Sequence, residues 1–156
     1  MSFLPQFPVE GGCICGAVRY RLMAPPLAVY ACHCRDCQRF ASGPYAVGTI
    51  VSRGDFAVTG ATVSTDRVGE SGRTVHQFAC ASCGCRIWHE AAGTPDSIIV
   101  RAGTLDDPAW ARPLVHTWTR SKLPWVELGD AMSFPGPVPN RQALYDAWSA
   151  HVNGRD

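Results

Sequence analysis

The 156-residue sequence has almost no excess charge, because 14 lysine and arginine residues nearly balance 13 aspartate and glutamate residues. With 17% charged residues and a formal net charge of +1, it has no positive field for a phosphate backbone and no negative field for cationic partners. The composition therefore argues against nucleic acid as a partner. We expect a small-molecule ligand instead.

Long hydrophobic runs are also absent, and no stretch approaches the roughly 18 apolar residues that a membrane span requires. Residues 1–12 have neither the basic start nor the continuous apolar segment of a secretory signal. We therefore expect no membrane association and a location in the reducing cytoplasm. Nothing in the sequence indicates an oligomeric state.

The sequence lacks internal repeats and low-complexity tracts, so its length fits one domain. Hydrophobic residues make up 46% of the chain and include five tryptophans, which is enough for a substantial core. We expect a single domain over residues 1–156, with its core at about 11–136.

Short β-prone runs separated by turn residues predict a mainly β fold. Val18, Tyr20 and Leu22 alternate with Arg19 and Arg21, which is the period of a strand with one buried face. We expect strands in this run and at 27–32, 45–51, 55–59, 62–68, 73–80, 85–90, 97–102 and 114–118.

Helix is predicted in two places only. Residues 35–41 can form a short helical turn before Gly43-Pro44 breaks it. A C-terminal helix at about 140–153 begins at Asn140, a good N-cap, and carries an apolar stripe four residues apart at Leu144, Trp148 and Val152. The residues before it, 121–139, read as an extended, irregular segment.

The eight cysteines are an even number, which would permit four disulfides. In a reducing compartment, however, closely spaced cysteines more often bind metal. Seven of them form three groups: Cys13 with Cys15, Cys32 with Cys34 and Cys37, and Cys80 with Cys83. Gly84 permits the positive φ that a knuckle after Cys80 often needs.

A structural zinc site takes four protein ligands, whereas a catalytic one takes three and keeps an open position. A Cys-x-x-Cys knuckle and a Cys-x-Cys turn together supply four thiols. The three-thiol group is then a second site with an open position, or it is completed by Cys85 or a histidine. Spacing alone does not decide which thiols share a metal.

Several sequence motifs together resemble the glutathione-dependent formaldehyde-activating enzyme family, whose domain is shared with centromere protein V. They are Gly-Gly-Cys13-Ile-Cys15-Gly-Ala-Val-Arg-Tyr, Cys32-His33-Cys34-Arg-Asp-Cys37-Gln-Arg, Phe78-Ala-Cys80-Ala-Ser-Cys83-Gly84 and Ser121-Lys-Leu-Pro-Trp125. The resemblance extends from about residue 11 to residue 136.

The resemblance implies a single zinc-binding domain of several small, coiled antiparallel sheets, of the β-tent type. It also implies a carbon–sulfur lyase activity that joins glutathione to formaldehyde as S-hydroxymethylglutathione. Two zinc ions are implied, one structural and one catalytic. Their implied ligands are Cys13, Cys15, Cys80 and Cys83 for the structural ion, and Cys32, Cys34 and Cys37 for the catalytic ion.

This chemistry is physically reasonable at an open three-thiol site. Zinc favours thiolate over thiol, so a small thiol such as glutathione would lose its proton on entering the fourth position. Three thiolates make the site formally −1, and Arg35 and Arg39 are candidates to offset that charge. We keep three other interpretations: a second structural zinc, a non-enzymatic zinc module that binds a protein, and a redox enzyme using Cys85.

Other polar and aromatic residues have simpler interpretations. His33 alternates with two thiols along an extended backbone, so we interpret it as a packed group rather than a ligand. We interpret His89 and His116 as core histidines. Trp118 and Trp125 are large enough to line a ligand cleft, although packing is the default interpretation for both.

Overall fold

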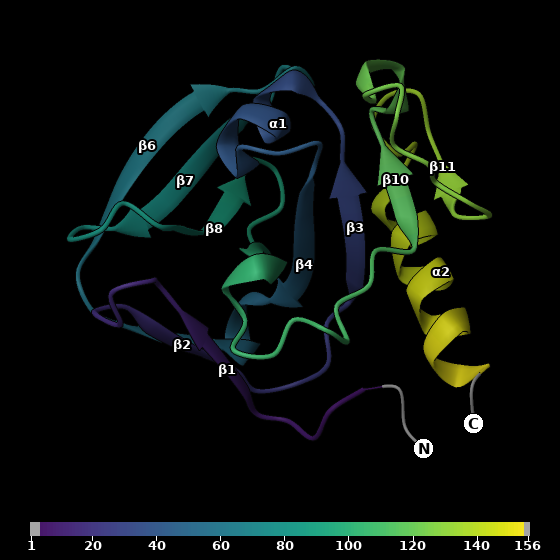
Figure 1. Ribbon diagram of the computed structural model, residues 1–156. Coiled ribbons are helices and arrows are strands. Elements are labelled where there is room, and N and C mark those ends of the chain that lie inside the picture. Colours follow the sequence, from purple (N-terminus) through teal and green to yellow (C-terminus); the bar gives the residue numbers. More distant parts are fainter. Residues whose placement is uncertain (1–3, 155–156) are drawn as a thin grey trace.

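The computed structural model describes residues 4–154, which form eleven β-strands and only two α-helices (Figure 1). The predicted mainly β class with a short C-terminal helix is confirmed. Strands occur in every run where the sequence predicts one, with bounds that shift by one or two residues. Two further strands, one near each end of the described chain, were not predicted.

A small antiparallel sheet has the order β1-β2-β5. Its strands are β1 (Val9–Gly12), β2 (Arg19–Leu22) and β5 (Phe56–Thr59). The two glycines before the predicted Cys-x-Cys turn, Gly11 and Gly12, belong to a strand and pair with β2. At Gly11 the Tyr20 ring occupies the space that a side chain would need, so here glycine permits close packing rather than a turn.

A larger sheet of eight strands has the order β11-β10-β3-β4-β9-β8-β7-β6. Most of its neighbours are antiparallel, as expected. Its strands are β3 (Ala28–Cys32), β4 (Ala46–Ser52), β6 (Thr62–Val68), β7 (Thr74–Cys80), β8 (Arg86–Ala91), β9 (Ser97–Arg101), β10 (Val115–Thr117) and β11 (Met132–Ser133).

Strand β10 departs from the antiparallel expectation, because it pairs in parallel with both β3 and β11. Parallel strands require a crossover connection. Residues 102–114 provide one by carrying the chain from β9 across to the free edge of β3. The irregular segment is therefore not a loose tail: the Trp118 N–H donates to the Gly136 carbonyl at 2.9 Å, and Phe134 donates to His116 at 2.9 Å.

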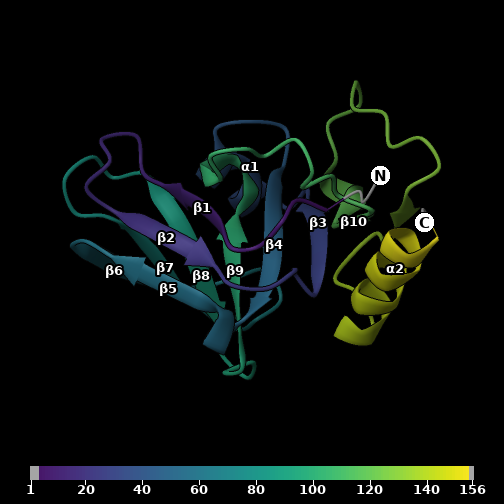
Figure 2. The same cartoon turned by 90° about the horizontal axis from the view of Figure 1, so that it is seen from below.

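The two sheets face each other and enclose the main core (Figure 2). Tyr20 and Leu22 from the small sheet are fully buried together with Ile50, Ile87 and Ile98 from the large one. The aromatic rings of Phe56 and Trp88 add a contact between the sheets at a centroid distance of 5.2 Å. Packing between the sheets thus fixes the ends of the strands that carry the cysteines.

Helix α1 (Arg35–Ala41) lies beyond the end of β3, and α2 (Arg141–Asn153) packs against β3 (Figure 1). As predicted, Asn140 caps α2, and its side chain accepts from the N–H of Ala143. Leu144 and Trp148 are buried in the core. Within residues 4–154, neither helix has the length and apolar character needed to span a membrane.

Candidate metal centre

The three-thiol group forms where β3 ends and α1 begins. Cys32 is the last residue of β3, and Cys34 is the N-cap of α1 with its sulfur accepting from the N–H of Cys37 at 3.3 Å. One helical turn then returns Cys37 to the other two thiols. The three sulfurs lie within 4.8 Å of one another, and all three residues are buried.

No fourth protein ligand completes this group in the part of the chain that the structure describes, residues 4–154. His33 points elsewhere: its Nε2 lies 2.8 Å from Nδ1 of His116, and its ring packs on Tyr45 at 4.9 Å between centroids. Cys85 belongs to neither thiol group and packs against the main core. The expectation that His33 is a packed residue agrees with these contacts.

The three thiols strongly influence one another. Hydrogen bonds from Cys32 and Cys37, assisted by the N–H at the start of α1, lower the pKa of Cys34. The pKa of Cys32 is raised, because its thiol keeps its proton to donate hydrogen bonds to the sulfurs of Cys34 and Cys37. Burial of Cys32 raises the pKa further. A compact group that already favours a thiolate is suited to binding a soft or borderline cation.

The second thiol group joins two turns. Cys13 and Cys15 lie on the turn after β1, and Cys80 and Cys83 lie on the knuckle between β7 and β8. Sulfur separations are 3.5 Å for Cys13–Cys15 and 3.7 Å for Cys15–Cys80. Tetrahedral zinc with bonds of about 2.3 Å requires sulfur separations of about 3.8 Å, so this group fits a zinc ion closely.

The backbone of the knuckle is tightly folded. Gly84 has φ of 72°, the positive value that the sequence predicts, and its N–H donates to the Cys80 carbonyl at 2.9 Å. A register shift between Phe78 and Ala79 precedes the knuckle and turns the end of β7. This group consequently links the small sheet to the large sheet.

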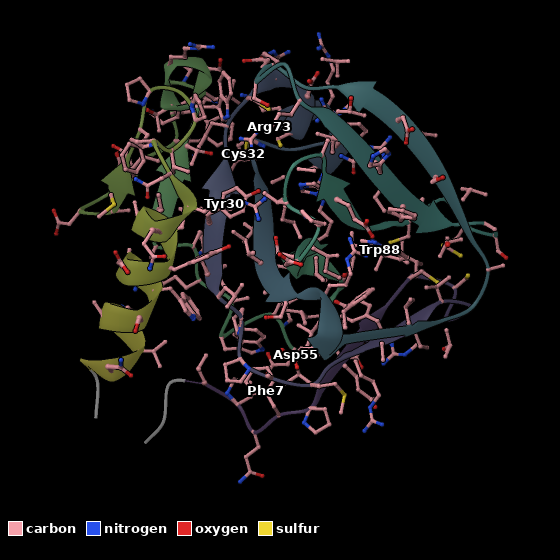
Figure 3. The ribbon with its side chains drawn as sticks, turned by 180° about the vertical axis from the view of Figure 1, so that it is seen from behind. Phe7, Tyr30, Cys32, Asp55, Arg73 and Trp88 are labelled. Atoms are coloured by element: carbon pink, nitrogen blue, oxygen red, sulfur yellow. The ribbon has the colours of Figure 1, made fainter. Side chains whose placement is uncertain are left out.

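A cavity of about 140 Å³ opens on the three-thiol group at Cys34. Tyr30 and Trp118 line it, and both pack against the thiols. Figure 3 shows Tyr30, Cys32 and Arg73 gathered in one region, away from Phe7 and Asp55. A larger hollow of about 640 Å³ lies between the end of α1 and the knuckle, but none of the three thiols lines it.

The lining of the Cys34 cavity includes residues that sequence reasoning missed. These are Tyr30, Arg67, Arg73 and Arg141. Of these, only Tyr30 had a usable signal, because it lies two residues before Cys32 and so shares its face of β3. His89 is buried as expected, but it lines this cavity, and its Nδ1 has no hydrogen-bond partner among residues 4–154.

The charged candidates from the sequence lie differently from the expectation. Arg35 donates to the side chain of Gln38, and Arg39 is exposed. Trp118 is buried and lines the cavity, whereas Trp125 is 69% exposed. Positive charge at the Cys34 cavity therefore comes from arginines distant in the sequence, which spacing around the cysteines does not indicate.

Three comparisons found known proteins that are similar to this chain. The family model described as "Glutathione-dependent formaldehyde-activating enzyme" matches residues 8–121. A Halomonas elongata protein named "Putative glutathione-dependent formaldehyde-activating enzyme" is 29% identical over 126 residues, covering 77% of this chain and 80% of that protein. A crystal structure of a Rhodobacter sphaeroides protein is 24% identical, with a TM-score of 0.49, covering 62% of this chain and 87% of that one.

The family match includes all seven cysteines of the two thiol groups and extends over most of the sequence. It also spans the strands that enclose the main core. The chain therefore belongs to the glutathione-dependent formaldehyde-activating enzyme family.

Proposed function

We propose that this protein is a zinc-dependent carbon–sulfur lyase that adds a small thiol, such as glutathione, to formaldehyde or a related carbonyl. One observation carries the proposal. A group of three buried thiols has no fourth protein ligand within residues 4–154, and one of the three, Cys34, opens on a cavity. That arrangement is typical of a catalytic rather than a structural metal site.

In this proposal Cys32, Cys34 and Cys37 hold the catalytic zinc, and Cys13, Cys15, Cys80 and Cys83 hold a structural one. The catalytic ion supplies Lewis-acid chemistry and favours the thiolate form of an incoming thiol. Together the two groups make up one zinc-binding domain of the β-tent type over residues 1–156. A reducing compartment such as the cytoplasm keeps all eight thiols available.

Tyr30 is the residue placed to assist the addition. It packs against the three-thiol group, lines the same cavity as Cys34, and forms no hydrogen bond through its hydroxyl within residues 4–154. Burial raises the pKa of Tyr30 well above its usual value, so the hydroxyl stays protonated at neutral pH. It is therefore available as a hydrogen-bond donor.

Addition of the thiol to the carbonyl needs no reactant besides these two molecules. The thiolate sulfur attacks the carbonyl carbon, a C–S bond forms, and the carbonyl electron pair moves to the oxygen. Tyr30 donates a hydrogen bond to that oxygen as its negative charge develops. The oxygen takes up a proton in place of the one that the thiol lost, so thiol and formaldehyde together give the S-hydroxymethyl hemithioacetal.

Two-dimensional exchange NMR of glutathione and formaldehyde, with and without the zinc-loaded protein, tests the activity. We expect the protein to accelerate exchange between free thiol and the S-hydroxymethyl adduct. Cys34→Ser should abolish that acceleration, and Cys85→Ser, which leaves both thiol groups intact, should retain it. Unchanged exchange rates across several thiols and aldehydes would rule out the proposed reaction.

The same variants, together with a metal-exchange measurement, separate the remaining interpretations. A redox enzyme that uses Cys85 would lose its activity in Cys85→Ser. A non-enzymatic zinc module would show no acceleration with any substrate. Such a module would also exchange its metal slowly at both sites, because each ion would then have four protein ligands.

A further inference from the structure

The Cys34 cavity holds more positive charge than its own acidic residues neutralise. Arg67 pairs with Asp36 at 2.7 Å, and Glu70 pairs with Arg120 at 3.6 Å. Arg73 and Arg141 also line the cavity, and neither has a carboxylate partner within the described range, 4–154. Two guanidinium groups are thus available to an anion.

These two arginines come from different parts of the fold. Arg73 lies just before β7, and Arg141 is the first residue of α2, where it donates to the hydroxyl of Ser97. Both also line an adjoining cavity of about 110 Å³, which shares Tyr30 and Trp118 with the first. Arg73 and Arg141 therefore line both cavities, together with Tyr30 and Trp118.

Two other residues that line the Cys34 cavity, Arg67 and His89, each have a buried nitrogen without a hydrogen-bond partner among residues 4–154. His89 is 9% exposed, and its Nδ1 forms no hydrogen bond among residues 4–154. Burial lowers the pKa of His89 well below its usual value, so the ring is neutral. A buried polar atom without a partner carries a free-energy cost that a bound ligand can relieve.

We propose that Arg73 and Arg141 bind a carboxylate of the thiol substrate while its sulfur reaches the metal position at Cys34. This inference rests on the proposed function and adds two residues that select thiols carrying a carboxylate, as glutathione does. Arginine suits this role because its planar guanidinium matches the two carboxylate oxygens. The 140 Å³ of the Cys34 cavity corresponds to about five water volumes, enough for the group that joins sulfur to carboxylate.

Binding can be measured without an aldehyde, so the test does not depend on the reaction. In cobalt-substituted protein, a thiolate that binds the metal gives a near-ultraviolet charge-transfer band. Mercaptoacetate and mercaptoacetamide are the paired probes, because they have the same size and differ in charge. Glutathione and its diethyl ester form a second pair.

We expect wild-type protein to bind mercaptoacetate at least tenfold more tightly than mercaptoacetamide. Arg141→Gln should reduce that ratio about tenfold, the effect of losing one charge-assisted hydrogen bond. Arg73→Gln should reduce it about threefold, because Arg73 is exposed and more strongly screened. Arg112→Gln removes the same charge from an exposed residue outside the cavity and should leave the ratio unchanged.

A second measurement covers the case in which neither thiol reaches the metal. Acetate is titrated into zinc-loaded protein, and the NMR signals of the arginine Nε–H groups are followed. Saturable shifts at Arg73 and Arg141, but not at Arg112, would support the anion site. Equal binding of the acid and the amide, or no shift with acetate, would overturn it even if the adduct assay is positive.

Discussion

Nε2 of His33 lies 2.8 Å from Nδ1 of His116 in the interior of the protein. One nitrogen must donate and the other must accept, so the two rings cannot both become imidazolium while keeping this contact. Nδ1 of His33 has no partner among residues 4–154, which disfavours a proton there as well. Burial, with a smaller contribution from His116, lowers the pKa of His33 to about 4, and burial also lowers that of His116.

This pair predicts a loss of stability in mild acid. His33 has a pKa of about 4 in the folded protein and an ordinary value of 6.5. Between these values the unfolded chain binds a proton that the folded chain does not, so the free energy of unfolding falls as the pH falls. The slope is about 1.4 kcal/mol per pH unit for each such proton.

Urea denaturation at several pH values measures that slope. His33→Gln keeps a donor toward His116 but does not titrate, so it should reduce the slope by about one proton between pH 6.5 and 4. His76→Gln is the control, because His76 is partly exposed and pairs with Asp66 at the surface. An identical slope in wild type and His33→Gln would contradict the prediction.

The two thiol groups should respond differently to loss of a ligand. Cys83→Ser should reduce the zinc content from two ions to one and lower the free energy of unfolding by about 2–5 kcal/mol, as expected for loss of a cross-link between distant segments. Cys34→Ser should also remove one ion, with a smaller effect on stability. Elemental analysis and chemical denaturation provide the two readouts.

Cys85→Ser is the matched control for the metal measurements, since Cys85 adjoins the knuckle without joining either group. It should keep both ions. Loss of zinc from this variant would show that Cys85 is a ligand after all.

Tyr30→Phe should slow adduct formation by about 10²–10³-fold, the usual effect of removing a hydrogen-bond donor to a developing oxyanion. Its zinc content and its affinity for the thiol should stay close to wild type, because the ring that packs on the thiols is retained. Stopped-flow kinetics and metal analysis separate the two effects. A rate within twofold of wild type would exclude Tyr30 from the chemistry.

Helix α2 should be attached to the sheet mainly by its buried aromatic residue. Trp148 is 4% exposed, so Trp148→Ala should lower the free energy of unfolding by about 3–5 kcal/mol. Trp125 is 69% exposed, and Trp125→Ala should change it by less than about 0.5 kcal/mol. Equal effects of the two substitutions on the denaturation midpoint would contradict this assignment.

The sequence predicts local features of this fold well. Alternation and turn residues located the strand runs, and Asn140 with the stripe at Leu144 and Trp148 located α2. The spacing of the cysteines was also sufficient to recognise three clusters, but it did not decide which clusters share a metal. Each of these signals lies within a few residues of the chain, where periodicity and backbone preference act directly.

The features that were missed depend on contacts between distant segments. The parallel pairing of β10 with β3 results from the crossover at residues 102–114, and no local pattern marks its direction. Arg73 and Arg141 meet at one cavity only after the large sheet and α2 have packed together. A single arginine in the sequence does not predict which cavity its side chain will line.

The family match ends at residue 121, whereas Arg141 lies at the start of α2, twenty residues further on. The two thiol groups and one wall of the Cys34 cavity thus belong to the shared part of the family, and another wall comes from the segment that follows it. The proposed metal ligands and Arg141, proposed to bind the carboxylate, are therefore encoded in separate parts of the chain. Exchanging this helix between family members should transfer the preference for one thiol over another and leave the metal sites as they are.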